Sequence, residues 1–212
     1  MSDYSHYILA FRLMSETLPD PRKRPRQARS VATFEAILEA AARILESLGF
    51  AGFNTNAVAE LAGVSIGSLY QYFPSKEALI VELVRRERIK LSSRIVEAIE
   101  QNDAADLKEK LKLVIHAAVQ HQLSRPQLAR TLEFASELIG KDTEENELQY
   151  ELETIISDLF ISSGISHAQL AAQDVIALSK GMINAAGIAG ESDLNHLQQR
   201  VEKAVFGYLE LY

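Results

Sequence analysis

Apolar side chains recur every three or four residues along most of this 212-residue chain. No segment alternates apolar and polar residues in the way that a half-buried strand would. The period predicts a helix between Ser30 and Gly49, a long helix from Ser75 to about Ile99, and further helices up to Leu209. We therefore predict an all-α fold.

Residues 55–76 predict two short helices joined by a tight turn. Thr55 is expected to cap the first helix by accepting a backbone N–H hydrogen bond. Gly63 is expected to end it in a left-handed conformation, from which Val64 returns to the core. The residues predicted to face inward at helical spacing are Ala57, Val58 and Leu61.

A second short helix is predicted from Ile66 to Phe73, capped by Ser65. Leu69 and Phe73 lie four residues apart and are expected to anchor it in the core. The residues left for other surfaces are polar, aromatic or small: Gly67, Ser68, Tyr70, Gln71 and Tyr72.

This second helix has the size and chemistry of an element that reads DNA. Eight residues give about 12 Å of helix, which fits the major groove. Gln71 can pair with adenine through two hydrogen bonds, Ser68 and Tyr70 can bond to bases or phosphates, and Tyr72 can reach the sugar-phosphate backbone. The alternative is an ordinary hairpin of an all-α protein, whose terminal tyrosines are only half-buried.

The segment V-A-E-L-A-G-V-S-I-G-S-L-Y-Q-Y-F-P-S-K-E-A-L, residues 58–79, resembles the DNA-binding segment of the TetR family of bacterial transcriptional regulators. The resemblance implies that the start of the first helix touches phosphate, that the second helix approaches bases, and that Tyr72 and Lys76 hold the backbone. Members often carry a polar or basic residue where Ile66 stands, so we expect Ile66 to contact a thymine methyl group. The DNA-binding residues predicted for this segment are Thr55, Asn56, Ser65, Ile66, Gly67, Ser68, Tyr70, Gln71, Tyr72 and Lys76.

A basic stretch lies immediately before the first predicted helix and includes Arg22, Lys23, Arg24 and Arg26. Such an arm can follow the minor groove or contact phosphates, although a solvated tail explains it equally well. Residues 1–90 hold 12 Lys and Arg against 10 Asp and Glu, whereas residues 91–212 hold 10 against 19. A chain with this asymmetry is expected to bind DNA through its N-terminal part.

Several functional classes are disfavoured by the composition. The chain has no cysteine, and no run of about 18 apolar residues could span a bilayer. We expect a soluble, cytoplasmic protein without a cofactor or a metal. The spacing closest to a helical di-metal motif is Asp193-Leu194-Asn195-His196, which occurs once, so we predict no enzymatic activity.

The predicted organisation is an N-terminal extension with the basic arm (residues 1–28), a three-helix DNA-binding domain (29–89) and a helical regulatory and dimerisation domain (90–212). In the last domain, Ser166 and Gln169 predict a capping box that opens a helix with the small-residue run 181–190. The final helix aligns Leu194, Leu197, Val201, Ala204, Val205, Tyr208 and Leu209. We expect these two helices to form a homodimer interface, the alternative being an intramolecular core.

By analogy with the family, a small-molecule effector is expected to bind among the middle helices. The polar and aromatic candidates there are His116, Gln120, Arg130, Phe134 and Glu137. The predicted function is a repressor that is released from a palindromic operator on double-stranded DNA by this effector. The alternative is an architectural or partner-regulating DNA-binding protein of the same fold that senses no small molecule.

Overall fold

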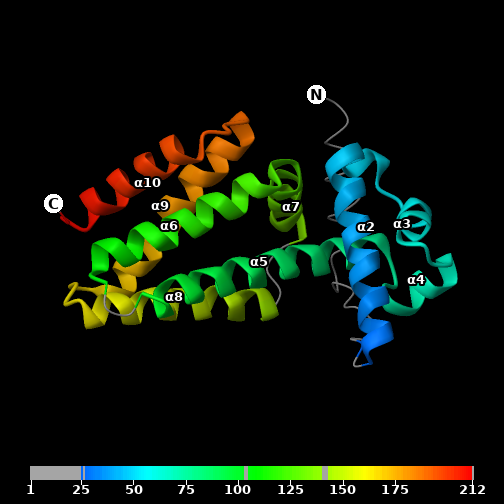
Figure 1. Cartoon of the computed structure of the whole chain (residues 1–212), viewed down its shortest axis with the longest axis horizontal. Helices are drawn as coiled ribbons and strands as arrows, with labels where there is room; N and C mark the ends of the chain where they lie inside the picture. Colours follow the sequence, from blue (N-terminus) through cyan, green and yellow to red (C-terminus); the bar gives the residue numbers. More distant parts are fainter. Residues whose placement is uncertain (1–24, 26, 103–104, 140–142, 212) are drawn as a thin grey trace. The chain divides into compact units, whose positions relative to one another are not determined.

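The computed structural model describes residue 25 and residues 27–102, 105–139 and 143–211. These residues form nine helices and no strand, so the predicted all-α class is confirmed (Figure 1). The helices are α2 (Ala28–Gly52), α3 (Thr55–Ala62), α4 (Ile66–Tyr72), α5 (Lys76–Glu100), α6 (Leu107–Ser124), α7 (Pro126–Ile139), α8 (Thr143–Ser162), α9 (Ala168–Ala189) and α10 (Leu194–Tyr208).

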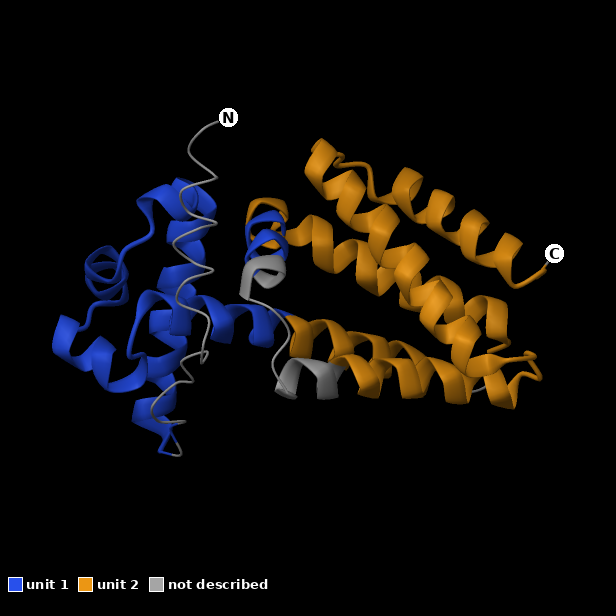
Figure 2. Cartoon of the chain, turned by 180° about the vertical axis from the view of Figure 1, so that it is seen from behind, with its two compact units in different colours: residues 1–87, 130–142 blue, residues 88–129, 143–212 orange. Residues whose placement is uncertain are grey.

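The chain divides into two compact units, coloured separately in Figure 2. Unit 1 comprises residues 1–87 and 130–142, and unit 2 comprises residues 88–129 and 143–212. Helices α5 and α7 each contribute residues to both units. No helix among the described residues is long and apolar enough to cross a membrane.

Helix α2 supplies the central face of unit 1. The apolar stripe predicted from its period is buried over Phe34, Ile37, Leu38, Ala41, Ile44 and Leu45. Leu48 lies at the same helical spacing as this stripe, but 57% of it is exposed. Gly49 follows with a φ of +60°, which interrupts the helical path directly after Leu48.

The N-cap of helix α3 is one residue earlier than predicted. Asn54, not Thr55, is the N-cap, and its side chain accepts a 2.9 Å hydrogen bond from the Ala57 amide. Asn54 has extended φ/ψ values while Thr55 is already helical, so the prediction for Thr55 is wrong. Leu61 is also misplaced, with 51% of it exposed, because the buried face passes through Val58 and Ala59 instead.

Helix α5 starts as predicted. The Ala78 amide donates to the Ser75 hydroxyl over 3.2 Å, which caps the first turn. Ala78, Leu79, Ile80 and Leu83 are then buried. With 25 residues, α5 is about 37 Å long at the usual helical rise.

The core of unit 2 is built by α6, α8, α9, α10 and the part of α5 that carries Ile95. Its buried members include Leu111 and Ile115 of α6, Phe160 of α8 and Ala172 of α9. Polar contacts between neighbouring helices join this core at its edge. The Gln173 amide of α9 donates to the Glu153 carboxylate of α8 over 3.1 Å.

One prediction for the C-terminal helices is wrong. The capping box at Ser166 and Gln169 does not form, because α9 starts at Ala168 after His167, which has a left-handed φ of 52° and makes no side-chain cap. The apolar stripe of α10 is buried over Leu197, Val201 and Val205 in the core of unit 2, while a homodimer interface formed by α9 and α10 stays a prediction. These three residues are therefore covered by their own chain.

Candidate nucleic-acid interface

The turn between α3 and α4 is fixed by backbone hydrogen bonds. Gly63 has a φ of +68°, as predicted, and its amide donates to the Glu60 carbonyl over 3.1 Å. The Val64 amide donates to the Ala59 carbonyl over 3.0 Å. This pair of bonds is a Schellman motif, which satisfies the carbonyls at the end of α3 and directs the chain into α4.

Helix α4 is held at both ends. Ser65 caps its start as predicted, because the Ser68 amide donates to the Ser65 hydroxyl over 3.1 Å. Leu69 and Phe73 are buried, and the Phe73 ring stacks on Phe34 of α2 with centroids 4.9 Å apart. The two predicted anchors of this helix are therefore in the core of unit 1.

The opposite face of α4 is exposed. Gln71 and Gly67 are exposed, as is 38% of Ile66 and 41% of Tyr70. A methyl group added at Gly67 would meet only the Ser65 hydroxyl, at 3.9 Å, so no contact within the protein requires glycine there. The face therefore offers one amide, one branched apolar side chain and a stretch of uncovered backbone.

Two pairs of hydroxyl groups lie beside this face. The Thr55 hydroxyl at the start of α3 is 3.1 Å from the Tyr70 hydroxyl of α4. The Ser65 and Ser68 hydroxyls are 2.8 Å apart. Ser68 is half-buried, so its hydroxyl is less accessible to a partner than the Gln71 amide.

The other predicted DNA-binding residues take different positions. Asn56 is exposed in the first turn of α3, and Lys76 is exposed at the first position of α5. Tyr72 is half-buried, with its ring edge-on to Phe34 and the centroids 6.1 Å apart. The predicted arm residues Arg22, Lys23, Arg24 and Arg26 lie outside the described residues.

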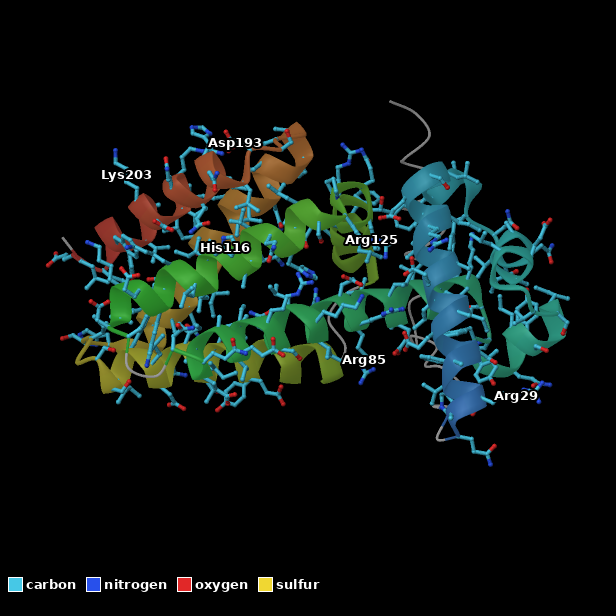
Figure 3. The ribbon with its side chains drawn as sticks, in the orientation of Figure 1. Arg29, Arg85, His116, Arg125, Asp193 and Lys203 are labelled. Atoms are coloured by element: carbon cyan, nitrogen blue, oxygen red, sulfur yellow. The ribbon has the colours of Figure 1, made fainter. Side chains whose placement is uncertain are left out.

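The effector-site candidates are spread over both units. His116 of α6 is half-buried, and its Nδ1 is 2.8 Å from the Gln198 amide oxygen of α10; Figure 3 labels it on α6. Gln120 is exposed in unit 2, while Arg130 and Phe134 belong to unit 1. The Glu137 side chain lies outside the described residues, and no described group of three His, Asp or Glu side chains could hold a metal ion.

Three features of the site were missed by sequence reasoning. Asn54 caps α3, Phe34 supports the aromatic end of α4, and Thr55 contacts Tyr70. Asn54 is itself a favoured capping residue, so the sequence contained a signal for the first. The other two join residues far apart in the chain, and helical period carries no information about such contacts.

Comparison with known proteins relates this hairpin to a family. Residues 37–83 match the sequence family described as "Bacterial regulatory proteins, tetR family". The chain is 29% identical over 145 residues to the HTH-type transcriptional repressor KstR of Rhodococcus jostii, covering 60% of this chain and 68% of that protein. It is 48% identical over 52 residues to the HTH-type transcriptional regulator RutR of Escherichia coli, covering 24% of each.

The fold is also similar to that of a solved regulator. The crystal structure of FadR from Bacillus subtilis in complex with stearoyl-CoA matches with a TM-score of 0.67 and 23% identity. The match covers 81% of this chain and 97% of that one. The family match and the named relatives show that the N-terminal part of the chain, residues 37–83, is a DNA-binding domain of the tetR family of bacterial regulatory proteins.

Proposed function

We propose that the chain is a repressor that inserts α4 into the major groove of its operator. The observation that carries this proposal is the division of α4 into two faces. Leu69 is buried, whereas Ile66 and Gly67 at the start of the helix and Gln71 near its end are exposed. A short helix fixed to a core in this way can present its outer residues to base edges.

Each exposed residue of α4 has a chemical role in this proposal. Gln71 pairs with adenine through its amide, and Ile66 contacts a thymine methyl group. Gly67 lets the helix backbone come close to the DNA. Tyr72 and Lys76 contact the sugar-phosphate backbone, which sets orientation and affinity without reading sequence.

Further contacts are proposed at the edges of the hairpin. Asn56 and the start of α3 face phosphate, as do the Ser65 and Ser68 hydroxyls where they are accessible. The basic arm, residues 22–26, lies in the minor groove or along the phosphates. Neutralising phosphates with Arg and Lys side chains makes the affinity strongly dependent on salt.

We propose that the repressor is a homodimer through α9 and α10. Support comes from apolar residues that their own chain leaves exposed on these helices, namely Leu170, Ile188 and Tyr208. A symmetric pair would place two α4 helices in successive major grooves about 34 Å apart. The operator is then a palindrome with one half-site for each protomer.

The proposed effector is an apolar or amphipathic small molecule that binds among the middle helices. The candidates His116, Gln120, Arg130, Phe134 and Glu137 remain proposals for its polar contacts. Helix α5 contributes to both units, so a change in its position could alter the separation of the two α4 helices. An effector that binds better to the altered state would shift the dimer away from DNA.

The experiment measures operator binding by fluorescence anisotropy while a ligand is added. Stearoyl-CoA is the first probe because the FadR fold neighbour was solved with it. Free CoA and stearate are the matched controls for its two halves. We expect the intact thioester to release the operator while the two controls leave it bound.

A negative result separates the two candidate functions. If acyl-CoA thioesters of every chain length leave the operator bound, an acyl-CoA is not the effector. Saturable binding of a second protein by the DNA-bound regulator would then favour the partner-regulating alternative. Operator binding without any ligand is measured in the same assay, so the proposed DNA binding is tested separately from the effector.

A further inference from the structure

The Thr55 hydroxyl does not cap helix α3. Asn54 already caps α3 by accepting the Ala57 amide, so the first turn does not need Thr55 for this purpose. The Thr55 Oγ1 instead lies 3.1 Å from the Tyr70 hydroxyl, across the hairpin and fifteen residues along the chain. This contact connects the start of α3 to the exposed face of α4.

Tyr70 differs from Tyr72 in what holds its ring. Tyr72 lies edge-on to Phe34 and is half-buried, so packing restricts its position. Of Tyr70, 41% is exposed, and the hydrogen bond at its hydroxyl joins it to Thr55. Removing that bond would leave the Tyr70 ring free to adopt other rotamers at the surface.

A count of protons shows what the pair can offer to a ligand. Each of the two hydroxyls carries one proton, and one of these protons is used in the bond between them. The other remains for donation outward, and the first bond strengthens it by polarisation. A phosphate oxygen only accepts hydrogen bonds, so a pair with one spare proton suits a phosphate.

We propose that Thr55 is a positioning residue for Tyr70 and that their two hydroxyls jointly bind one phosphate of the operator. Tyr70 then contributes affinity and orientation rather than base preference. The inference rests on the proposed insertion of α4 into the major groove. It adds that the two residues act as one unit and that neither works fully without the other.

The test is a double-mutant cycle with Thr55→Val and Tyr70→Phe, each of which removes one hydroxyl and keeps the side-chain shape. Affinity is measured by fluorescence anisotropy on an operator sequence selected from random DNA duplexes. Each single variant should bind about 10-fold more weakly, the loss expected for one hydrogen bond to a charged acceptor. The double variant should also bind about 10-fold more weakly than the wild type. Two independent losses would instead multiply to about 100-fold.

Two further variants separate positioning from a general effect on structure. Thr55→Ser keeps the hydroxyl and should restore affinity to within about twofold, a factor below the ordinary value of a hydrogen bond. Ser68→Ala, in the neighbouring hydroxyl pair, should combine with Tyr70→Phe multiplicatively. Thermal unfolding of each variant shows whether the fold is retained.

The phosphate itself can be located by replacing single operator phosphates with neutral methylphosphonates. One replacement should weaken the wild-type protein and have no further effect on Thr55→Val or Tyr70→Phe. Multiplicative losses in the cycle, failure of Thr55→Ser to restore binding, or altered base preference in Tyr70→Phe would overturn the inference. Absence of operator binding by the wild-type protein would instead overturn the proposed function.

Discussion

Replacement of Gly67 by alanine separates the stability of the protein from its approach to DNA. The added methyl group would meet only the Ser65 hydroxyl at 3.9 Å, which is an ordinary van der Waals distance. Alanine is favoured over glycine within a helix by about 0.5–1 kcal/mol. Gly67→Ala should therefore leave the fold intact and raise Tm by up to about 4 °C for a protein of this size.

The same methyl group should weaken operator binding. If the backbone of α4 approaches the DNA closely at Gly67, the methyl group occupies the space between them. We expect a loss of at least about 1.4 kcal/mol, which is tenfold in affinity. Fluorescence anisotropy at about 150 mM salt measures this loss with nonspecific attraction held down.

A matched control exists in the other unit. Gly207 lies in α10, and a methyl group added there would meet nothing within 4 Å. Gly207→Ala should leave operator affinity unchanged when gel filtration shows the oligomeric state to be unchanged. Unaltered affinity of Gly67→Ala would refute the close approach of α4, and a lower Tm would refute the open space around Gly67.

Four further substitutions test other parts of the molecule. Gln71→Ala should cost about 1–3 kcal/mol and relax the preference at one base pair, whereas Lys76→Ala should weaken all sequences and lower the salt slope by about one ion; binding to operator variants over a salt series checks both. Leu197→Ala should lower the free energy of unfolding in urea by about 2–5 kcal/mol, because the side chain is buried in its own protomer; a loss below 1 kcal/mol would contradict that packing. The contribution of Glu191 to stability should depend on pH. Burial raises the pKa of its carboxyl group, but hydrogen bonds from Arg200 and His196 lower that pKa to below its ordinary value overall. Its stabilisation is therefore present above the ordinary glutamate pKa of about 4.3 and is lost as the pH falls through the lower folded pKa. Thermal unfolding should show Glu191→Gln below the wild type at pH 7, with the difference disappearing in acid; a difference independent of pH would contradict this assignment.

Local backbone chemistry made part of the hairpin predictable. Gly63 and Ser65 have the conformations expected of them, because a left-handed turn and a helix N-cap each favour a few residue types. The same reasoning failed at Thr55, where two adjacent residues can both cap. Asn54 takes the role, since it has the extended conformation of an N-cap and its side chain accepts the Ala57 amide.

The sequence predicted which residues of α10 are buried, but it did not predict which part of the protein covers them. The period of α10 correctly selected Leu197, Val201 and Val205 as apolar and inward-facing. It could not say whether the same chain or a second copy covers them. That distinction depends on how the helices of unit 2 assemble, which no local pattern encodes.

The candidate site was predictable in its residues and not in their connections. Leu69 and Phe73 are anchors because they lie four residues apart, and the remaining side chains of α4 are outside by exclusion. The contact between Thr55 and Tyr70 joins two helices, so it depends on their packing angle. The spacing of fifteen residues carries no such information.

The most direct test of the account is to select bound sequences from a library of random DNA duplexes at about 150 mM salt, where nonspecific phosphate attraction is reduced. We expect a palindrome to be enriched, with half-site centres about one helical turn apart, since two α4 helices would lie about 34 Å from each other. Failure to enrich any sequence with a folded dimer would contradict sequence reading by α4.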